Sequence, residues 1–580
     1  MQADSRKIIS ENIVADRSKL KIICVFLHRI YFGRIPYERQ YRGKKRKAMN
    51  ITELQQSYAS HPNVEGVCRL LKDNSVRHLY CGGLYASAAS LFSSVLVQRA
   101  TCPLVFILGD MEEAGYFYHD LTQILGTEQV LFFPSSFRRA IKYGQKDAAN
   151  EILRTEVLSR LQKGEEGLCV VTYSDALAEK VVSRKELGEN TLKLHAGERV
   201  DMNFVTDVLR SYGFEYVDYV YEPGQYAVRG SIIDVFSFSS EYPFRIDFFG
   251  DEVESVRTFE VETQLSKEKK ESIVIVPDLS HSLEKKGSGG MVSFLDFLPS
   301  DSLLAMRDFL WLRERIQIVH DESLTPQAIA ARESEENGAI TLEGKLIDGG
   351  EFTLRALDFR RMEFGNKPTG TPDATVSFHT TAQPIFHKNF DMVAESFREY
   401  LSRHYTIYIC SDSLKQTDRI RAIFEDRGDD ISFTAVERTL HEGFADDTLR
   451  IGVFTDHQLF DRFHKYNLKS DKARSGKVAL SLKELNQFTP GDYVVHTDHG
   501  VGRFAGLVRI PNGDTTQEVM KIVYQNEDVV FVSIHSLHKV SKYKGKEGEA
   551  PRLNKLGTGA WEKLKDRTKT KIKDIARDLI

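Results

Sequence analysis

Short apolar runs alternate with amphipathic stretches along most of this chain. The runs at residues 104–108, 129–133, 168–172 and 405–410 have the length and composition of buried strands. Residues 147–162 and 390–401 instead place apolar side chains at helical spacing. Strands that alternate with helices are typical of α/β units with parallel sheets. The pattern therefore predicts a multidomain α/β protein.

Length and composition narrow the class of protein further. The chain has 580 residues, and roughly 100–200 residues per domain indicates about four domains. A hydrophobic share of 41% and a formal net charge of -4 fit an ordinary globular protein. No apolar run reaches the roughly 18 residues needed to cross a membrane, so we expect no membrane contact. The six cysteines form no CxxC pair, which argues against a zinc cluster and favours a reducing cytoplasm.

The first 48 residues are basic and differ from the rest of the chain. They end in a run of four cations at residues 44–47, while their apolar run at 22–27 is too short for a secretory signal. A nucleic-acid-binding arm is one interpretation. The other is a non-native extension, because Met49 is followed by a natural helix start with Thr52 near the cap. We favour the second.

The first candidate site is a loop of small residues between a short strand and a predicted helix at 90–99. This is the arrangement of a P-loop, whose pattern is GxxxxGK[ST]. Alanines stand where the pattern has its second glycine and its lysine, so the main positive charge on the phosphates is lost. The positions compared are Gly83, Ala88, Ala89 and Ser90. An ordinary strand–turn–helix is the simpler interpretation of these residues alone.

No acidic partner motif of the hhhhDE type accompanies this loop. The nearest candidate, residues 303–308, has Arg307 where the first acid would stand. The loop therefore indicates a degenerate phosphate site and not a working nucleotide hydrolase.

The second candidate site is a predicted β-meander at residues 221–259, punctuated by Pro-Gly and Gly-Asp turns. Strand alternation places Arg245 and Asp247 on one face, with Ile246 and Phe248 on the other. Exposed arginine and phenylalanine side chains together are typical of protein interfaces.

Residues 229–236 and 244–257 resemble the second domain of the excision-repair protein UvrB and of the transcription-repair coupling factors. In those proteins this domain binds the damage-recognition ATPase UvrA. By motif position, the resemblance implies that Arg229, Arg245 and Phe249 carry the contact. An alternative is that both arginines pair with Asp234 or Asp247 inside the domain.

Two features favour the coupling factors over UvrB. UvrB has an intact P-loop, whereas this chain lacks the lysine. UvrB also carries a long aromatic-rich hairpin that probes damaged DNA, and residues 134–147 are too few to hold one.

The third candidate site lies at residues 490–533. Several short strands separated by turns within about 60 residues predict a small SH3- or Tudor-like barrel. His496, Asp498 and His499 suggest a metal site, but the pattern supplies no third ligand and is not on one helical face. We expect no metal here and interpret the histidines as hydrogen-bonded structural residues.

This segment resembles the RNA-polymerase-interacting module that coupling factors share with CarD-type regulators, and the similarity continues to Trp561. In that family an exposed strand pairs with the polymerase β subunit. The resemblance implies that the strand is 518–524 and that Met520 is its apolar contact, by strand addition at a free edge. The alternative is that Met520 faces the core of the barrel. The implied polymerase-binding residues are Glu518, Val519, Met520, Lys521 and Ile522.

Residues 561–580 form an amphipathic pattern without a helix terminator. In the family a long helix here leads into two ATP-driven motor domains that move on double-stranded DNA. We expect those motor domains to be missing from this chain. ATP and Mg²⁺ are therefore expected only in the missing domains, as is most of the contact with DNA, and no cofactor is expected in this chain.

The patterns predict a degenerate P-loop (RecA-like) domain, a further small α/β domain and a small β barrel, and the resemblance implies that the P-loop domain carries an inserted UvrA-binding α+β domain. The expected divisions are an extension at 1–48, the P-loop domain at 49–178 and 276–388, the UvrA-binding domain at 179–275, a small α/β domain at 389–470, the barrel at 486–548 and a linker helix at 552–580.

The expected function is transcription-coupled nucleotide-excision repair. The barrel would grip stalled RNA polymerase while the UvrB-like module recruits UvrA, and the chain would act as a monomeric adaptor with no catalytic residues of its own. The alternative is a UvrB-like ATP-dependent helicase, which Ala89 in place of the P-loop lysine disfavours.

Overall fold

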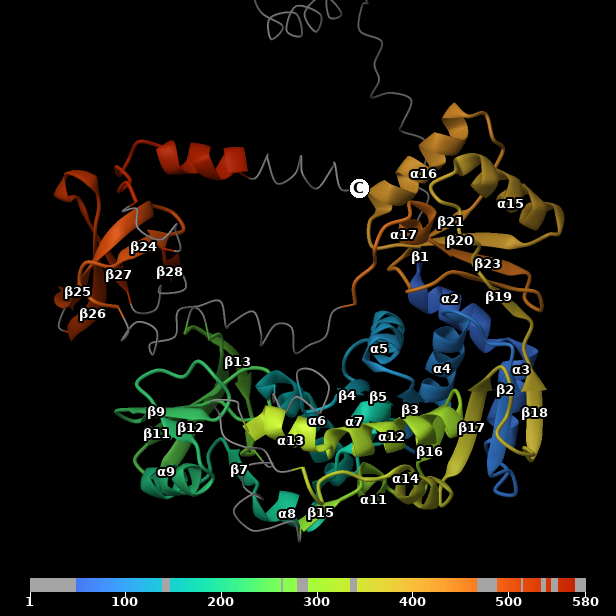
Figure 1. The fold of residues 1–580 in the computed structure, drawn as a ribbon, viewed down its shortest axis with the longest axis horizontal. Helices are drawn as coiled ribbons and strands as arrows, with labels where there is room; N and C mark the ends of the chain where they lie inside the picture. The colour runs from blue at the N-terminus through green and yellow to red at the C-terminus, as the bar shows by residue number, and fades with distance from the viewer. Residues whose placement is uncertain are drawn as a thin grey trace, which may run out of the picture. The chain divides into compact units, whose positions relative to one another are not determined.

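The structure is a computed structural model that describes residues 48–137, 147–261, 264–278, 290–333, 342–466, 488–512, 515–533, 539–543 and 551–568. Residues 560–568 are helical, as expected for the C-terminal segment. The remainder of the predicted linker helix, the basic extension and most of the segment compared with the UvrB hairpin lie outside the described residues. Within the described residues the fold is mixed α/β with several separate sheets (Figure 1).

A seven-stranded parallel sheet, called the first sheet, has the order β18-β2-β17-β16-β3-β5-β4. Its neighbouring strands β16, β3 and β5 are buried along their whole length, which explains why they read as continuous apolar runs. Its strands are β2 (His78–Gly82), β3 (Leu104–Leu108), β4 (Val130–Phe133), β5 (Cys169–Tyr173), β16 (Leu303–Met306), β17 (Arg360–Gly365) and β18 (Ala374–Ser377).

Helices connect these strands and begin at side-chain caps. Asp110 accepts hydrogen bonds from two amides at the start of α5, and Asp147 caps α6. The helices around this sheet are α2 (Ile51–Ala59), α3 (Pro62–Leu70), α4 (Ala88–Arg99), α5 (Met111–Leu125), α6 (Ala148–Lys163), α7 (Ser174–Ala178), α8 (Arg184–Glu189), α11 (Phe294–Phe297), α12 (Phe309–Ser323), α13 (Pro326–Glu333) and α14 (Gly349–Ala356). The predicted strands and the helix at 147–162 are confirmed to within one or two residues.

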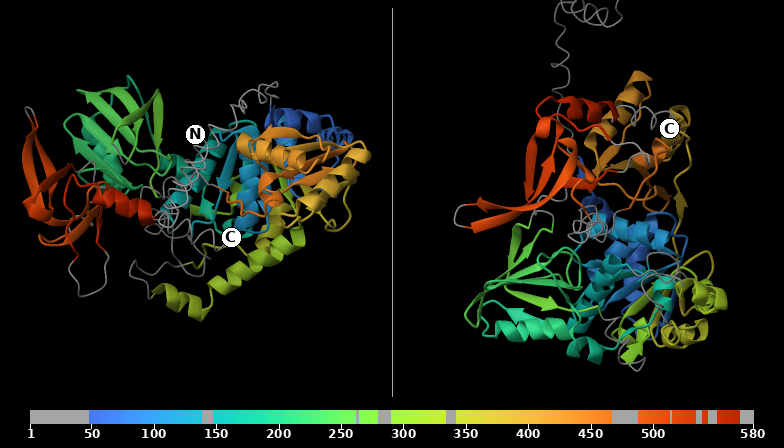
Figure 2. Two further views of the ribbon diagram at one scale, coloured as in Figure 1. Left: turned by 90° about the horizontal axis from the view of Figure 1, so that it is seen from above. Right: turned by 60° about the vertical axis from the view of Figure 1, so that its left-hand side comes forward.

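The chain forms a separate second sheet between β5 and β16 (Figure 2). Its order is β13-β12-β11-β10-β9-β8, antiparallel except for the pair β8–β9, and α9 (Met202–Ser211) packs against it. The strands are β8 (Glu215–Tyr216), β9 (Gln225–Arg229), β10 (Ile232–Val235), β11 (Phe244–Phe249), β12 (Glu252–Phe259) and β13 (Ser266–Lys270). Two short pairs flank it, β7 (Leu192–His195) with β14 (Ser272–Ile275) and β6 (Val181–Val182) with β15 (Met291–Val292).

A six-stranded third sheet has the order β1-β21-β20-β23-β22-β19. Helices α15 (Phe390–Ser402), α16 (Leu414–Asp426) and α17 (Asp456–Leu459) complete this layer, and the predicted helix at 390–401 is confirmed. Its strands are β1 (Met49–Asn50), β19 (Thr380–Ala382), β20 (Thr406–Ser411), β21 (Thr434–Glu437), β22 (Phe444–Asp446) and β23 (Ile451–Thr455).

Residues 488–543 form a five-stranded antiparallel sheet, called the C-terminal sheet, with the order β27-β26-β25-β24-β28. Its strands are β24 (Tyr493–His496), β25 (Gly500–Asn512), β26 (Thr515–Val523), β27 (Val529–Ser533) and β28 (Val540–Lys542). Residues 551–561 pack on β25, because Asn554 accepts a 2.8 Å hydrogen bond from the amide of Val501 and Trp561 donates to the Thr497 carbonyl. Gly500 has a φ of +81°, and a side chain there would meet both Asn554 and Trp561.

Among the described residues, no helix is long and apolar enough to span a membrane. The five cysteines in the described part of the chain form no disulfide with one another.

Candidate docking surfaces and the degenerate phosphate loop

The small-residue loop lies at the carboxyl end of β2 and leads into α4, the position of a phosphate loop in a parallel sheet. Gly83 has a φ of +76°, and a Cβ atom there would stand only 2.0 Å from the Phe378 carbonyl oxygen. Helix α4 starts at Ala88, two residues before the predicted start at Ser90. Ala88 and Ala89 are buried, so no side chain from the lysine position reaches the loop's open side.

The amides at the start of α4 already have partners inside the protein. The Ser87 amide donates to the Glu442 carbonyl at 3.4 Å, and Ala88 and Ala89 donate to carbonyls within the loop. The carboxylate of Asp120, on α5, accepts a 2.6 Å hydrogen bond from the Ser87 hydroxyl. Burial raises the pKa of Asp120 to about 7, against the hydrogen bonds that favour its charged form.

Residues 303–308 do not supply an acidic partner. Arg307 pairs with Glu113 at 2.7 Å, and Asp308 caps α12 by accepting from the Trp311 amide. Asp308 is therefore used as a helix cap, in keeping with the degenerate interpretation of the loop.

A cavity of about 670 Å³ opens beside the loop, at the carboxyl ends of the central strands. Both arginines on its wall are paired with acids, Arg307 with Glu113 and Arg462 with Asp456. Its lining includes Ser87, Ser90, Asp120, His441, His464 and Phe463. Among the described residues that line it, the cavity thus offers no unpaired arginine or lysine to a nucleotide's phosphates.

On the second sheet, Asp234 holds both arginines of the UvrA-type motif. Arg245 donates to its carboxylate at 2.8 and 2.9 Å, and Arg229 pairs with it from the neighbouring strand. The Asp234 side chain is fully buried, whereas 32% of Arg229 and 14% of Arg245 remain exposed. The structure therefore shows the alternative named in the sequence analysis, in which both arginines pair with an aspartate inside the domain.

Phe249 behaves differently from the arginines. It ends β11 directly before the turn at Gly250, and 79% of its surface is exposed. Its neighbours along β11, Ile246 and Phe248, are buried as the alternation predicted. Of the three implied UvrA-binding residues, Phe249 is thus the one whose side chain has little role inside its own domain.

The expectation that residues 518–524 form a free edge strand is wrong. Strand β26 lies inside the C-terminal sheet, hydrogen-bonded to β25 on one side and to β27 on the other. Met520 is fully buried in the core, together with Phe504, Ile522 and Val532. Val519 and Ile522 are also buried, and Lys521 is half-buried. Glu518, the first residue of the implied polymerase-binding set, lies on β26 opposite Arg509 of β25.

Among the described residues the C-terminal sheet has two edge strands, β27 and β28, and β27 is the one beside β26. It pairs only with β26, and its outward residues Val529 and Phe531 are 38% and 50% exposed. In register, Phe531 lies opposite Lys521, while Val532 lies opposite the buried Met520. An accessible backbone edge and an exposed aromatic residue are therefore found one strand later than the motif comparison implied.

The histidines of the third candidate site are structural in their geometry. His496 is buried and accepts a 3.1 Å hydrogen bond from the Asp498 amide, and its ring stacks on His499 with centroids 4.6 Å apart. Across the part of the chain that the structure describes, no group of three or more potential ligands is arranged to hold a metal ion.

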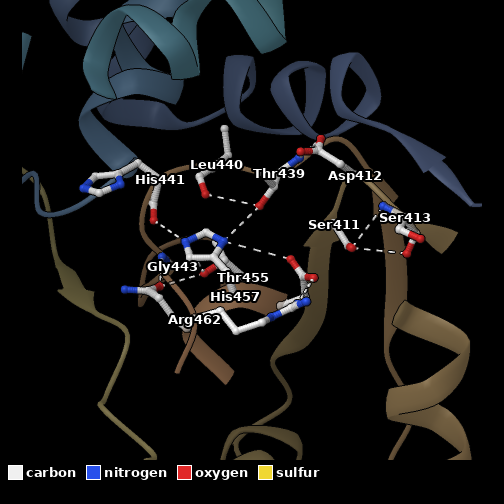
Figure 3. A network of polar contacts seen from close by, with 12 residues as sticks. Ser411, Asp412, Ser413, Thr439, Leu440, His441, Gly443, Thr455, His457 and Arg462 are labelled. Carbon is white, nitrogen blue, oxygen red and sulfur yellow. Dashed lines mark hydrogen bonds and ion pairs between the residues drawn. The ribbon is translucent and has the colours of Figure 1, made fainter. Parts of the chain in front are cut away.

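Sequence reasoning missed the residues of the third sheet that meet the degenerate loop. The His457 imidazole accepts or donates at three points, to Thr439, Thr455 and the His441 carbonyl, and so fixes the loop at 439–443 (Figure 3). The His441 ring stacks on Tyr116 of α5 with centroids 3.5 Å apart. Tyr116 and His441 lie more than 300 positions apart, so no sequence motif could have predicted their contact.

Comparison with known proteins adds two domain matches. The family model for the UvrB interaction domain matches residues 192–281, which cover the second sheet and its flanking strands. The family model for the CarD-like/TRCF RID domain matches residues 488–544, which cover the C-terminal sheet.

Curated relatives match a larger part of the chain. A transcription-repair-coupling factor of Bacillus subtilis (strain 168) is 23% identical over 576 residues, covering 86% of this chain and 48% of that protein. One from Staphylococcus aureus (strain bovine RF122 / ET3-1) is 24% identical over 563 residues, with the same two coverages. The chain spans about half the length of the curated relatives it matches. The two domain models and these relatives agree, and they confirm the resemblance of this chain to the transcription-repair coupling factors of DNA repair.

Proposed function

We propose that this chain is the adaptor part of a transcription-repair coupling factor, which recognises RNA polymerase stalled at a lesion and recruits UvrA in the cytoplasm. The observation that carries the proposal is that a UvrB interaction domain and a CarD-like/TRCF RID domain occur in one chain. The experiment is a bridging assay, in which immobilised polymerase should retain UvrA only when this chain is added. Retention of UvrA without the chain, or no retention with it, would contradict the proposal.

The degenerate loop favours an adaptor over a UvrB-like helicase. We assign the family's motor activity to the half of the relatives that this chain does not match. We assign ATP, Mg²⁺ and most of the contact with double-stranded DNA to the same half. The chain itself is proposed to act as a monomer, with the degenerate P-loop domain, the inserted UvrA-binding domain and the small barrel as separate working parts.

For UvrA binding, Phe249 gives the sharpest test. We expect Phe249→Ala to weaken UvrA binding about tenfold or more, since a central aromatic contact is commonly worth ~2 kcal/mol. Thermal stability should stay within about 2 °C, because 79% of the side chain is already exposed. Calorimetric titration with UvrA and a melting curve measure the two effects.

Phe204 supplies a matched control on the same domain, because it lies on α9 and is 54% exposed. Phe204→Ala should leave UvrA affinity unchanged. Arg245→Ala is less informative, since it also leaves the buried Asp234 carboxylate with one partner fewer and should lower stability. Equal binding by wild type and Phe249→Ala would remove Phe249 from the interface.

For polymerase binding, we propose that an extended strand of the β subunit adds to β27, with Phe531 as its apolar contact. The support is the free edge and the 50% exposed ring. Phe531→Arg should reduce affinity for the β subunit about tenfold or more while the domain remains folded. Leu507→Arg is the control, because Leu507 is exposed on the interior strand β25. Unchanged binding by Phe531→Arg, measured by biolayer interferometry, would place the contact elsewhere.

A further inference from the structure

The start of helix α4 is the place where a phosphate loop would hold an anion, because the first amides of a helix are unpaired within it and carry partial positive charge. In this chain an anion from the protein itself stands there. Asp120 is 2% exposed and accepts hydrogen bonds from the side chains of Ser87 and Ser90, at the first residues of the helix.

The carboxylate of Asp120 also binds the loop between β21 and β22 of the third sheet. Its second oxygen accepts a 2.7 Å hydrogen bond from the His441 amide, and the Ser87 hydroxyl accepts 3.0 Å from the Glu442 amide. The Glu442 carbonyl in turn accepts from the Ser87 amide. The Asp120 carboxylate, the Ser87 hydroxyl and amide, and the backbone of residues 441–442 thus bind one another across the degenerate loop and the third sheet.

Neighbouring contacts fix the loop at 439–443 in this position. Tyr116 of α5 stacks on the His441 ring and donates a 2.7 Å hydrogen bond to the His464 carbonyl. On the other side of α4, Tyr58 of α2 donates to the buried Asp446 of β22 at 3.1 Å. His457 also holds the loop through the His441 carbonyl (Figure 3). Gln458 accepts a 2.7 Å hydrogen bond from the Gly443 amide of the same loop.

We propose that Asp120 takes the place of a nucleotide's phosphate and that the former phosphate loop serves as a permanent latch for the third sheet. The latch consists of Ser87, Asp120, His441 and Glu442. In a working P-loop the loop's contacts with a neighbouring domain depend on the bound nucleotide; here the carboxylate is covalently part of the chain, so the contact is independent of ATP. This assigns a role to residues 439–464, which the adaptor function does not otherwise use.

The first measurement is hydrogen exchange of the His441 and Glu442 amides in the full chain. Wild type should protect both amides equally with and without MgATP. Asp120→Ala should raise their exchange about tenfold or more, since it removes the acceptor of the His441 amide, while amides of β20 remain protected. Asp120→Asn keeps the shape of the side chain. Whether this variant folds therefore distinguishes loss of the latch from unfolding of the whole domain. Exchange that slows on adding MgATP, or protection that Asp120→Ala leaves unchanged, would overturn the proposal.

The second measurement is anion binding, with inorganic pyrophosphate as the probe in calorimetric titrations. Wild type should show no binding at millimolar pyrophosphate, and Asp120→Ala should gain it, because the Ser87 and Ser90 hydroxyls and the His441 amide lose their acceptor and become free for an anion. Glu112→Ala is the matched control, since Glu112 is an exposed acid on α5 that lines the same cavity, and it should gain nothing. Equal pyrophosphate binding by wild type and both variants would show that Asp120 does not occupy the anion position.

Discussion

Replacing Met520 with arginine is expected to unfold the C-terminal sheet, not to disturb a single contact with polymerase. Met520 is fully buried and packs with Phe504, Ile522 and Val532 in the core of that sheet. A guanidinium there would lose its hydration without gaining a partner, and the side chain lost would leave its neighbours poorly packed. We expect a loss of about 4 kcal/mol or more in the free energy of unfolding of this domain.

Urea denaturation followed by tryptophan fluorescence can measure this loss, since Trp561 packs at β25 of the same domain. Phe531→Arg is the matched control, because it introduces the same charge on the adjacent strand at a 50% exposed position. If Met520→Arg unfolds at the wild-type urea concentration yet fails to bind polymerase, Met520 is a surface contact after all and the burial described above is wrong.

The error over β26 shows what a strand pattern can predict. The run of apolar residues at 518–524 identifies a strand, which the structure confirms as part of β26. The residues do not show that Met520 lies in the core, because the comparison with the family places it at an exposed contact. They do not identify the strand's neighbours, because hydrogen-bond partners come from other parts of the chain. The same limit applies to Arg229 and Arg245. Alternation places them on a common face, but only the register of β9, β10 and β11 brings both onto Asp234.

The strands of the first sheet could be predicted from the sequence, whereas the contacts at its phosphate loop could not. Its central strands are buried on both faces, so continuous apolar runs identify them directly. Asp120 carries no such signal: it is one acid within an amphipathic helix. Its partner His441 lies 321 positions away, on a loop between two strands of another sheet. The missing lysine predicts a degenerate phosphate loop, but it gives no sign of the contacts that Asp120 makes there.

The buried carboxylate at this loop also has a consequence for stability. Burial, the largest cause, raises the pKa of Asp120 from 3.8 to about 7. The folded state therefore binds this proton more tightly than the unfolded chain does. The stabilising contribution is fully present below about pH 4 and is lost as the pH rises through about 7. Nearby histidines act in the opposite direction: burial lowers the pKa of His119 and His457 to about 4, so their contribution is lost as the pH falls from about 6.5 toward 4.

Asp120→Asn isolates the carboxylate, because both proteins share the histidines and an amide does not ionise. We expect its free energy of unfolding, relative to wild type, to rise by about 2–3 kcal/mol between about pH 5 and pH 9, since one pKa unit corresponds to about 1.4 kcal/mol. Urea denaturation at a series of pH values measures the difference. The side chain is 2% exposed, so salt should change this difference little. Parallel pH profiles for the two proteins would mean that Asp120 ionises as readily in the fold as in the unfolded chain.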